Sequence, residues 1–184
     1  MMMSDPLVEF FNLAMDRHLE VPCHWEDWGI VTQEESPLIL NVGAGNKLIP
    51  GTTVLDLPRW NADTDPIPFD DATVSGIHAY HFLEHVHRPA DVLWEFQRVL
   101  KVHGFVNICV PYYNAQCQAQ DLDHKHAFCE ETWRNLFVNP YYSRRWDARG
   151  PWQFLIRTNV IMGLVERNLV LLTQLIKVER ESTQ

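Results

Sequence analysis

A short run of apolar residues, Leu38 to Val42, leads directly into Gly43-Ala44-Gly45, and this junction limits the folds open to the chain. A nearly continuous apolar run of this length is typical of a strand that is buried on both faces of a parallel sheet. Glycines at the end of such a strand let the backbone turn tightly and let a ligand approach the main chain. The junction therefore predicts an α/β fold with a binding loop after its first strand.

The residues that follow alternate between strand and helix patterns, as expected for an α/β sheet. The predicted helix at Pro89–Leu100 has apolar positions at helical spacing and a proline in its first turn. Gly104 ends the link that follows, and Pro111 stops the next strand. The remaining predicted elements are strands at Thr52–Asp56, Val74–Ala79 and Phe105–Val110 and a helix at Glu130–Val138.

Two apolar runs near the end, Gln153–Val165 and Leu169–Val178, admit two interpretations. They form either an antiparallel hairpin that closes the sheet edge or one long helix. We favour the hairpin, because branched residues suit strands and the polar residues Glu166-Arg167-Asn168 suit a turn between them. The exposed face of this hairpin is a candidate dimer surface.

The length of 184 residues suits one domain, which we divide into residues 1–37, 38–138 and 139–184. The first part holds a predicted helix at Pro6–Leu19 and a covering segment at Pro22–Pro37, where Trp25 and Trp28 either form a lid or pack on the flank. The second is the predicted ligand-binding core. The third carries the hairpin and the predicted substrate side.

Charge and cysteine content limit the partners and the cellular compartment that we expect for the protein. The net charge of −9 argues against nonspecific binding of nucleic acid. The four cysteines form no CxxC pair, no basic leader precedes an apolar segment, and no apolar run is long enough to span a membrane. We therefore expect a cytoplasmic protein with reduced thiols and no membrane contact.

Asp56 ends the second predicted strand, where a carboxylate can accept two hydrogen bonds from a ribose diol. A dinucleotide fingerprint would place a third glycine at position 48 and a full helix between the two strands. Here position 48 is leucine and only a short link through Pro50-Gly51 precedes the second strand. The pattern disfavours NAD or FAD, although a nucleotide-dependent oxidoreductase stays an alternative.

An ordered set of motifs resembles the class I S-adenosylmethionine-dependent methyltransferases, in particular small bacterial and phage enzymes. The resemblance covers about residues 38 to 138 and implies a Rossmann-like fold with helices on both faces of a mostly parallel sheet. One departure is Lys101-Val102-His103-Gly104, where the family has Lys-Pro-Gly-Gly. The matching segments are Leu38–Asn46, Val54–Asp56, Ile67–Asp71, Phe82–Val86, Arg98–Lys101 and His124–Phe128.

The resemblance implies S-adenosylmethionine as cofactor and assigns residues to it. Residues at the end of the first strand would line the methionine end, and Asp56 would bind the ribose hydroxyls with Leu57 against the adenine. Asp63, with Thr64 beside it, would help to bind the adenine, or Asp65 would take that role. His81 would lie beside the methionine moiety. The residues at the methionine end are Gly43, Ala44, Gly45 and Asn46.

Methyl transfer from a sulfonium needs alignment, exclusion of water and at most one base. Candidate bases follow the predicted strands on the side where open α/β sheets bind ligands. His124 and His126 are the first candidates for substrate contact, although they would equally well cap the helix at Glu130. Tyr112 is a candidate wall of the substrate pocket. The other candidates are His81, Glu84, His85 and Tyr113.

A metal site is not expected, because the histidines do not form a His-Glu-x-x-His pattern. The expected function is therefore methyl transfer to a small molecule or a saccharide, with a noncatalytic domain that binds cofactor or a partner as an alternative. Residues 131–184 hold 8 basic and 5 acidic residues, against 7 and 19 before them, so an anionic acceptor, nucleic acid included, stays open. Five of the 8 basic residues gather where such a fold would build its acceptor region: Arg134, Arg144, Arg145, Arg149 and Arg157.

Overall fold

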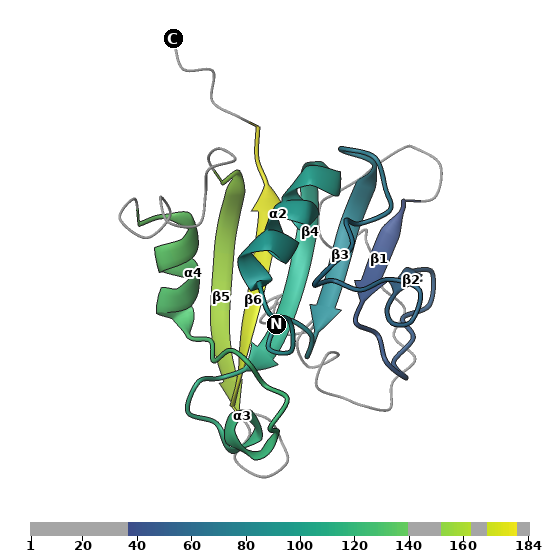
Figure 1. Ribbon diagram of the computed structural model, residues 1–184. Coiled ribbons are helices and arrows are strands. Elements are labelled where there is room, and N and C mark those ends of the chain that lie inside the picture. The colour runs from purple at the N-terminus through teal and green to yellow at the C-terminus, as the bar shows by residue number, and fades with distance from the viewer. Residues whose placement is uncertain (1–36, 140–151, 163–168, 180–184) are drawn as a thin grey trace, which may run out of the picture.

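Six strands pair into one mixed sheet in the order β2-β1-β3-β4-β6-β5 in the computed structural model, which describes residues 37–139, 152–162 and 169–179 (Figure 1). Strands β1 (Ile39–Val42), β2 (Thr53–Leu55), β3 (Val74–Tyr80) and β4 (Leu100–Pro111) run parallel to their neighbours in this set. Their carboxyl ends therefore lie along one edge of the sheet, the lower edge in Figure 1. The prediction of a mostly parallel, Rossmann-like α/β sheet is confirmed.

The C-terminal segments form the predicted antiparallel hairpin, and the alternative of one long helix is wrong. Strand β5 (Phe154–Met162) pairs with β6 (Leu169–Lys177), and β6 in turn lies antiparallel to β4. The β6 side chains are almost all buried, which explains why the run is apolar on both faces. Lys177, at the end of β6, donates hydrogen bonds to the carbonyl groups of Gln97 and Leu100 and so ties the hairpin to the preceding helix.

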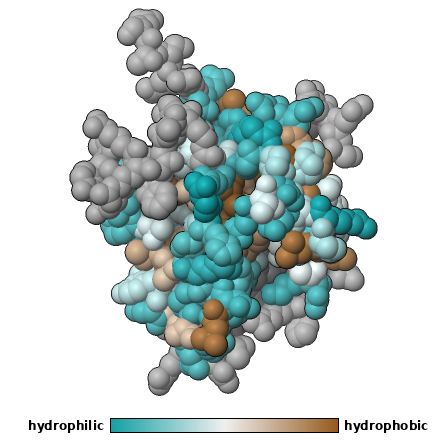
Figure 2. All heavy atoms as spheres, viewed as in Figure 1, coloured by the Kyte–Doolittle hydropathy of each residue, from teal (hydrophilic) through white to brown (hydrophobic). Residues whose placement is uncertain are grey.

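Helix α2 (Pro89–Val99) packs across the face of β3, β4 and β6 (Figure 1). Its buried side chains include Leu93 and Phe96, which join the main apolar cluster with Ile77, Val106 and Leu171 from the sheet. The outer surface on this side is mostly hydrophilic, with hydrophobic atoms in small separate groups (Figure 2). The predicted amphipathic helix with proline in its first turn is confirmed.

Helix α4 (Glu130–Phe137) lies beside β5, and Trp133 is the residue that it buries. A second short helix, α3 (Gln116–Gln120), was not predicted from the sequence. It buries none of its residues, so it carries no apolar periodicity by which a sequence pattern would show it. Helices α3 and α4 both lie between β4 and the hairpin in the chain.

Strand β4 begins earlier than predicted, because Leu100 pairs with Val74 before the register shifts. Pairing resumes at Gly76 and Phe105, where the Phe105 ring fills the space that a side chain at Gly76 would need. The link expected at Lys101–Gly104 is therefore an irregular part of the strand. The later stretch of β4 is buried, as predicted for Phe105–Val110.

The predicted helix at Pro6–Leu19 and the covering segment with Trp25 and Trp28 lie outside the described residues. Cys109, Cys117 and Cys129, the cysteines in the described part of the chain, are free thiols. Burial raises the pKa of the Cys109 thiol well above its ordinary range, so this group is a poor nucleophile. Within the described ranges, the structure holds no helix that is long and apolar enough to cross a membrane.

Candidate functional site

The loop after β1 is held in a conformation that depends on glycine. Gly43 has φ of 65° and Gly45 has φ of 51°, both in the left-handed region that side chains disfavour. The Gly43 N–H donates to the carbonyl of Leu55, which fastens the loop to β2 over 2.9 Å. Ala44 is buried, whereas Gly45 and Asn46 are exposed. The glycine junction therefore forms the tight, accessible turn that the sequence predicted.

Asp56 joins the loops that follow β1 and β2. Its Oδ2 accepts a hydrogen bond of 2.7 Å from the Gly45 N–H, and its Oδ1 accepts one of 2.8 Å from the Leu57 N–H. The carboxylate is only partly buried, and each of its oxygens keeps a lone pair for a further donor. Leu57 is 68% exposed, so its side chain presents an apolar surface beside the carboxylate. The arrangement suits recognition of a diol next to an apolar ring.

Asp63, Thr64 and Asp65 lie in a turn after β2, but they have different partners. Thr64 Oγ1 donates to Asp65 Oδ1 at 2.9 Å, and Asp65 Oδ2 accepts from the Asn61 N–H. Asp63 reaches away from this turn to His87, accepting from the His87 N–H at 2.7 Å and contacting its Nδ1 at 2.7 Å. Partial burial would raise the pKa of Asp63, but the hydrogen bonds from His87 outweigh it and hold that pKa below its ordinary value. His87 is thus a partner of this site that no local sequence pattern indicates.

His81 follows β3 at the carboxyl edge of the sheet. Its φ of 51° is unusual for a residue with a side chain, and its N–H donates to the Cys109 carbonyl on β4. Its Nδ1 lies 3.3 Å from Glu84 Oε1, within ion-pair distance but outside hydrogen-bond geometry. Its Nε2 lies 3.7 Å from the Cys109 sulfur. The imidazole is therefore held in place by the strand ends on both sides.

The segment that carries His124 and His126 is bound to the end of β3 by its backbone. The Glu84 carbonyl accepts hydrogen bonds from the N–H groups of Lys125 and His126, and the Lys125 ammonium donates to the His85 carbonyl. These contacts bring His124 against His85, with ring centroids 4.7 Å apart. His126 Nε2 instead contacts the His87 carbonyl at 3.2 Å.

The two histidines do not cap helix α4, so that interpretation is wrong. The helix begins after Cys129, whose N–H is bound by the Thr132 hydroxyl at 3.1 Å. His124 Nδ1 faces the Gln118 carbonyl at 3.2 Å, and its ring is only 7% exposed. Both histidines instead lie against the segment that follows β3, His124 at the His85 ring and His126 at the His87 carbonyl.

Tyr112 lies at the end of β4, and its hydroxyl donates to Glu130 Oε2 at 2.9 Å. This hydrogen bond raises the pKa of Tyr112 to about 12, so the phenol stays protonated at neutral pH and is a poor general base. The tyrosine ring contacts Tyr113 with ring centroids 4.9 Å apart. Its position fits a pocket wall better than a proton acceptor.

Of the basic residues singled out in the C-terminal part, only Arg134 has a described side chain. Arg134 pairs with Glu131 on helix α4 at 3.1 Å. Arg144, Arg145 and Arg149, together with the side chain of Arg157, lie outside the described residues. Two hollows on the described surface lie away from the glycine loop and Asp56, and the larger of these two is beside Leu38, Thr73 and Arg98 at the amino ends of the strands.

Comparisons with known proteins agree with this geometry. Residues 44–108 match the family model of the methyltransferase domain. No curated protein matches the chain in sequence.

Solved structures of low sequence identity share the fold. A chain from the Haloferax volcanii complex between the Trm112 methyltransferase activator and a presumed methyltransferase has a TM-score of 0.56 at 15% identity, covering 97% of this chain and 100% of that one. A 16S rRNA (adenine(1408)-N(1))-methyltransferase from Catenulisporales acidiphilia has a TM-score of 0.54 at 10% identity, covering 88% and 95%. A methyltransferase from Methanosarcina mazei has a TM-score of 0.53 at 14% identity, covering 87% and 100%.

The family match covers the glycine loop from Ala44 onward, Asp56, the end of β3 and most of β4, whereas Tyr112, His124 and His126 lie beyond it. The fold of the solved relatives extends over the hairpin as well, since they cover most of the chain. Residues 44–108 therefore match a methyltransferase domain in sequence, and the chain as a whole shares the fold of solved S-adenosylmethionine-dependent methyltransferases.

Proposed function

We propose that the glycine loop and Asp56 hold S-adenosylmethionine and that its methyl group passes to a small-molecule acceptor, a saccharide or a similar polar compound. The main support for this donor site is the hydrogen bond from the Gly45 N–H to Asp56 Oδ2. It joins the loops after β1 and β2 at the carboxyl edge of the sheet. Ligands of open α/β sheets bind at this edge.

The residues at this edge fit the donor. A Cβ atom added to Gly45 would meet nothing within 4 Å, so the main chain there faces open space that a ligand can enter. Asp56 keeps acceptor capacity for the ribose hydroxyls, and Leu57 offers its exposed side chain to the adenine. The bound donor supplies an activated methyl group on a sulfonium, and the chain supplies position and exclusion of water.

The acceptor would lie next to the donor, over the ends of β3 and β4. His81 is our candidate base, because it precedes Phe82, whose ring packs directly on Gly43 of the glycine loop. Glu84 stands behind the His81 ring at 3.3 Å and would stabilise its protonated form after a proton is taken from the acceptor. His124, His126 and Tyr112 border the same edge and would contact the acceptor.

Titration calorimetry with S-adenosylhomocysteine tests the donor site. We expect Asp56→Asn to weaken binding by about 10- to 100-fold, since hydrogen bonds to a charged group contribute roughly 1.5–3 kcal/mol. Asp70→Asn is the matched control, because Asp70 is an exposed carboxylate beside the hollow at the opposite ends of the strands. Unchanged affinity of Asp56→Asn would show that Asp56 does not hold the ribose, and preferential binding of NAD would favour the oxidoreductase alternative.

The acceptor class is tested with a donor that carries a deuterated methyl group. Cell extract is incubated with the protein and this donor, and the small-molecule, RNA and protein fractions are compared by mass spectrometry. We expect the label in a small polar compound, and much slower labelling with Asp56→Asn at a donor concentration near the affinity of the parent. Label that appears only in RNA or protein would overturn the proposed acceptor class while leaving the donor site intact.

A further inference from the structure

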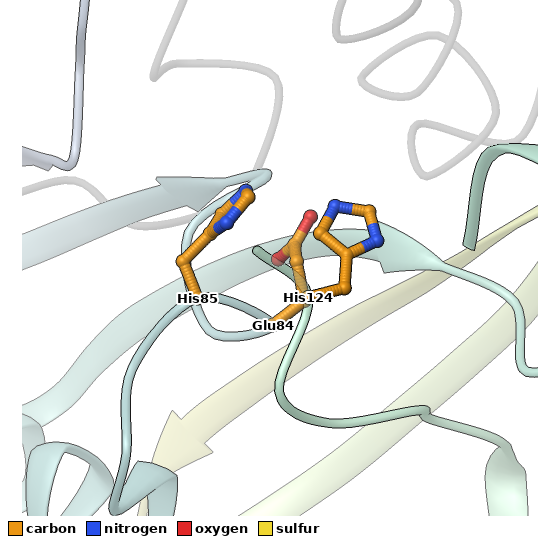
Figure 3. Close-up of side chains that lie close together, drawn as sticks. All are labelled: Glu84, His85 and His124. Atoms are coloured by element: carbon orange, nitrogen blue, oxygen red, sulfur yellow. The ribbon is translucent and has the colours of Figure 1, made fainter. Parts of the chain in front are cut away.

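A buried carboxylate and two histidines meet at the end of β3, outside the glycine loop. Glu84, His85 and His124 each offer a ligand atom, and these atoms all lie within 4.8 Å of one another. Figure 3 shows the Glu84 carboxyl between the two imidazole rings, with one ring nitrogen of His124 turned toward it and the other turned away. Two residues come from the end of β3 and the third from the segment before α4.

Among the described residues, the Glu84 carboxylate is buried without a partner that would account for its burial. It is 0% exposed, and neither carboxylate oxygen receives a hydrogen bond in the described part of the chain. A buried carboxylate without hydrogen bonds is costly unless a cation compensates for it. His81 Nδ1, at 3.3 Å from Oε1, approaches one of the two oxygens from the side of the donor loop. The other oxygen remains available to a metal cation.

The His124 ring is oriented as a metal ligand would be. Its Nδ1 lies 3.2 Å from the Gln118 carbonyl, which can only accept, so Nδ1 carries the proton and Nε2 keeps its lone pair. Histidines that bind metals usually donate their second N–H to a carbonyl or carboxylate in this way. Asp121 adds an exposed carboxylate 3.7 Å from Nε2 at the rim.

The backbone holds the three residues together before any ion binds. Glu84 and His85 are consecutive, and the Glu84 carbonyl accepts from the Lys125 N–H at 2.7 Å, directly after His124. The Lys125 side chain closes the same contact by donating to the His85 carbonyl. Small side-chain rotations are therefore sufficient to bring the three ligand atoms onto one ion.

We propose that Glu84, His85 and His124 form a binding site for a divalent first-row transition metal such as Zn²⁺. Two imidazoles and one carboxylate are a common ligand set for such ions, and a site with three protein ligands keeps a coordination position open. That position would take an oxygen donor of the acceptor, an extension that rests on the proposed function. Metal binding itself requires neither the donor nor the acceptor.

Cobalt titration of the full chain, purified without metal, tests the proposal. Co²⁺ reports its ligands through visible absorption, and we expect saturable binding of one ion per chain that Zn²⁺ displaces and excess Mg²⁺ does not. Glu84→Gln and His124→Asn should each weaken this binding by more than about 10-fold. The control His103→Asn removes an exposed histidine far from the cluster, at a left-handed position that asparagine tolerates, and should bind as the parent does.

Circular dichroism shows whether each variant folds. If Glu84→Gln does not fold, His85→Asn provides the second test of metal binding. Three results would overturn the proposal. The parent chain could fail to bind Co²⁺ or Zn²⁺ saturably, the folded variants could bind as well as the parent, or strong thiolate-to-cobalt absorption in the near ultraviolet could show cysteine ligands instead. None of these results bears on binding of S-adenosylhomocysteine, so failure of this site and failure of the donor site are distinguishable.

Discussion

Gly43 lies so close to the ring of Phe82 that a Cβ atom on Gly43 would stand 2.3 Å from the ring carbon Cδ2. The ring belongs to the residue just after His81, so the loop after β1 and the loop after β3 are packed on each other at the point where the donor is proposed to bind. A glycine is required at this position both for the left-handed φ of 65° and for this contact.

Alanine at the two glycines of this loop should therefore have different effects. Gly43→Ala adds overpacking to backbone strain and should destabilise the fold by roughly 2–4 kcal/mol. Gly45→Ala meets open space and should cost only about 1–2 kcal/mol of strain, but its methyl group would enter the donor site. We expect it to weaken binding of S-adenosylhomocysteine by at least about 10-fold, or 1.4 kcal/mol. Denaturant unfolding and calorimetry measure the two effects, and undiminished binding by Gly45→Ala would place the donor elsewhere.

The pairing of Asp63 with His87 gives a test of the predicted adenine contact. His87→Gln leaves the Asp63 carboxylate in place without its imidazole partner, whereas Asp63→Asn removes the charge itself. If Asp63 binds the adenine, donor affinity should fall in Asp63→Asn and persist in His87→Gln. Equal affinities of both variants and the parent in calorimetry would assign the Asp63–His87 pair a purely structural role.

The same carboxylate predicts an acid-dependent loss of stability. Its pKa in the folded protein lies below the ordinary value of about 3.9, so the stabilisation is complete above that pH and is lost as the pH falls through the lowered pKa. The parent should therefore be more stable than Asp63→Asn at neutral pH, and the difference should shrink at low pH. A constant difference across an acid titration of the unfolding free energy would contradict this assignment.

Most of the sheet could be predicted from the sequence, because its signals are local. The apolar run before Gly43, the proline at the start of α2 and the polar residues between β5 and β6 each mark an element by neighbouring residues. Helix α3 escaped prediction because it buries no side chain. The early start of β4 was not predictable, because it depends on the pairing of Leu100 with Val74, which lies on another strand.

The individual residues of the site could be predicted from the sequence, but their contacts with one another could not. The sequence marks Glu84, His85 and His124 as polar residues near strand ends, but nothing in their spacing shows that they meet. Their contact depends on backbone hydrogen bonds between Glu84 and Lys125, across 41 positions of the chain. The pairing of Asp63 with His87 depends in the same way on tertiary structure, and no local pattern reports it.

His78 in β3 should give the stability a second pH dependence, at a higher pH than Asp63. The ring is fully buried, and burial lowers its pKa to about 4 from about 6.5. Because the unfolded chain takes up the proton first, stability is complete above about pH 6.5 and falls by up to about 1.4 kcal/mol per pH unit toward pH 4. His78→Gln should remove this slope in urea unfolding measured across the range, and an unchanged slope would assign the dependence to other groups.

Arg98 should contribute far more to stability than an ordinary surface arginine. Its guanidinium lies between the end of α2 and the segment before β3, where it donates to the Ile67 and Phe69 carbonyls as well as to Glu95 and Asp71. The hydrogen bonds that Arg98 donates to Glu95, followed by the one that it donates to Asp71, raise the pKa of Arg98 above its ordinary value despite partial burial.

Arg98→Lys keeps the charge but cannot reproduce this planar set of donors. We expect it to destabilise the fold by about 1–3 kcal/mol, because carbonyl groups of the 66–73 segment lose their partners. Arg88→Lys is the matched control, since the Arg88 side chain is 78% exposed and forms a salt bridge with Asp91 at the start of the same helix. Its effect should stay within about 0.5 kcal/mol. Equal midpoints of the two variants in thermal or denaturant unfolding would show that the Arg98 network adds nothing beyond its charge.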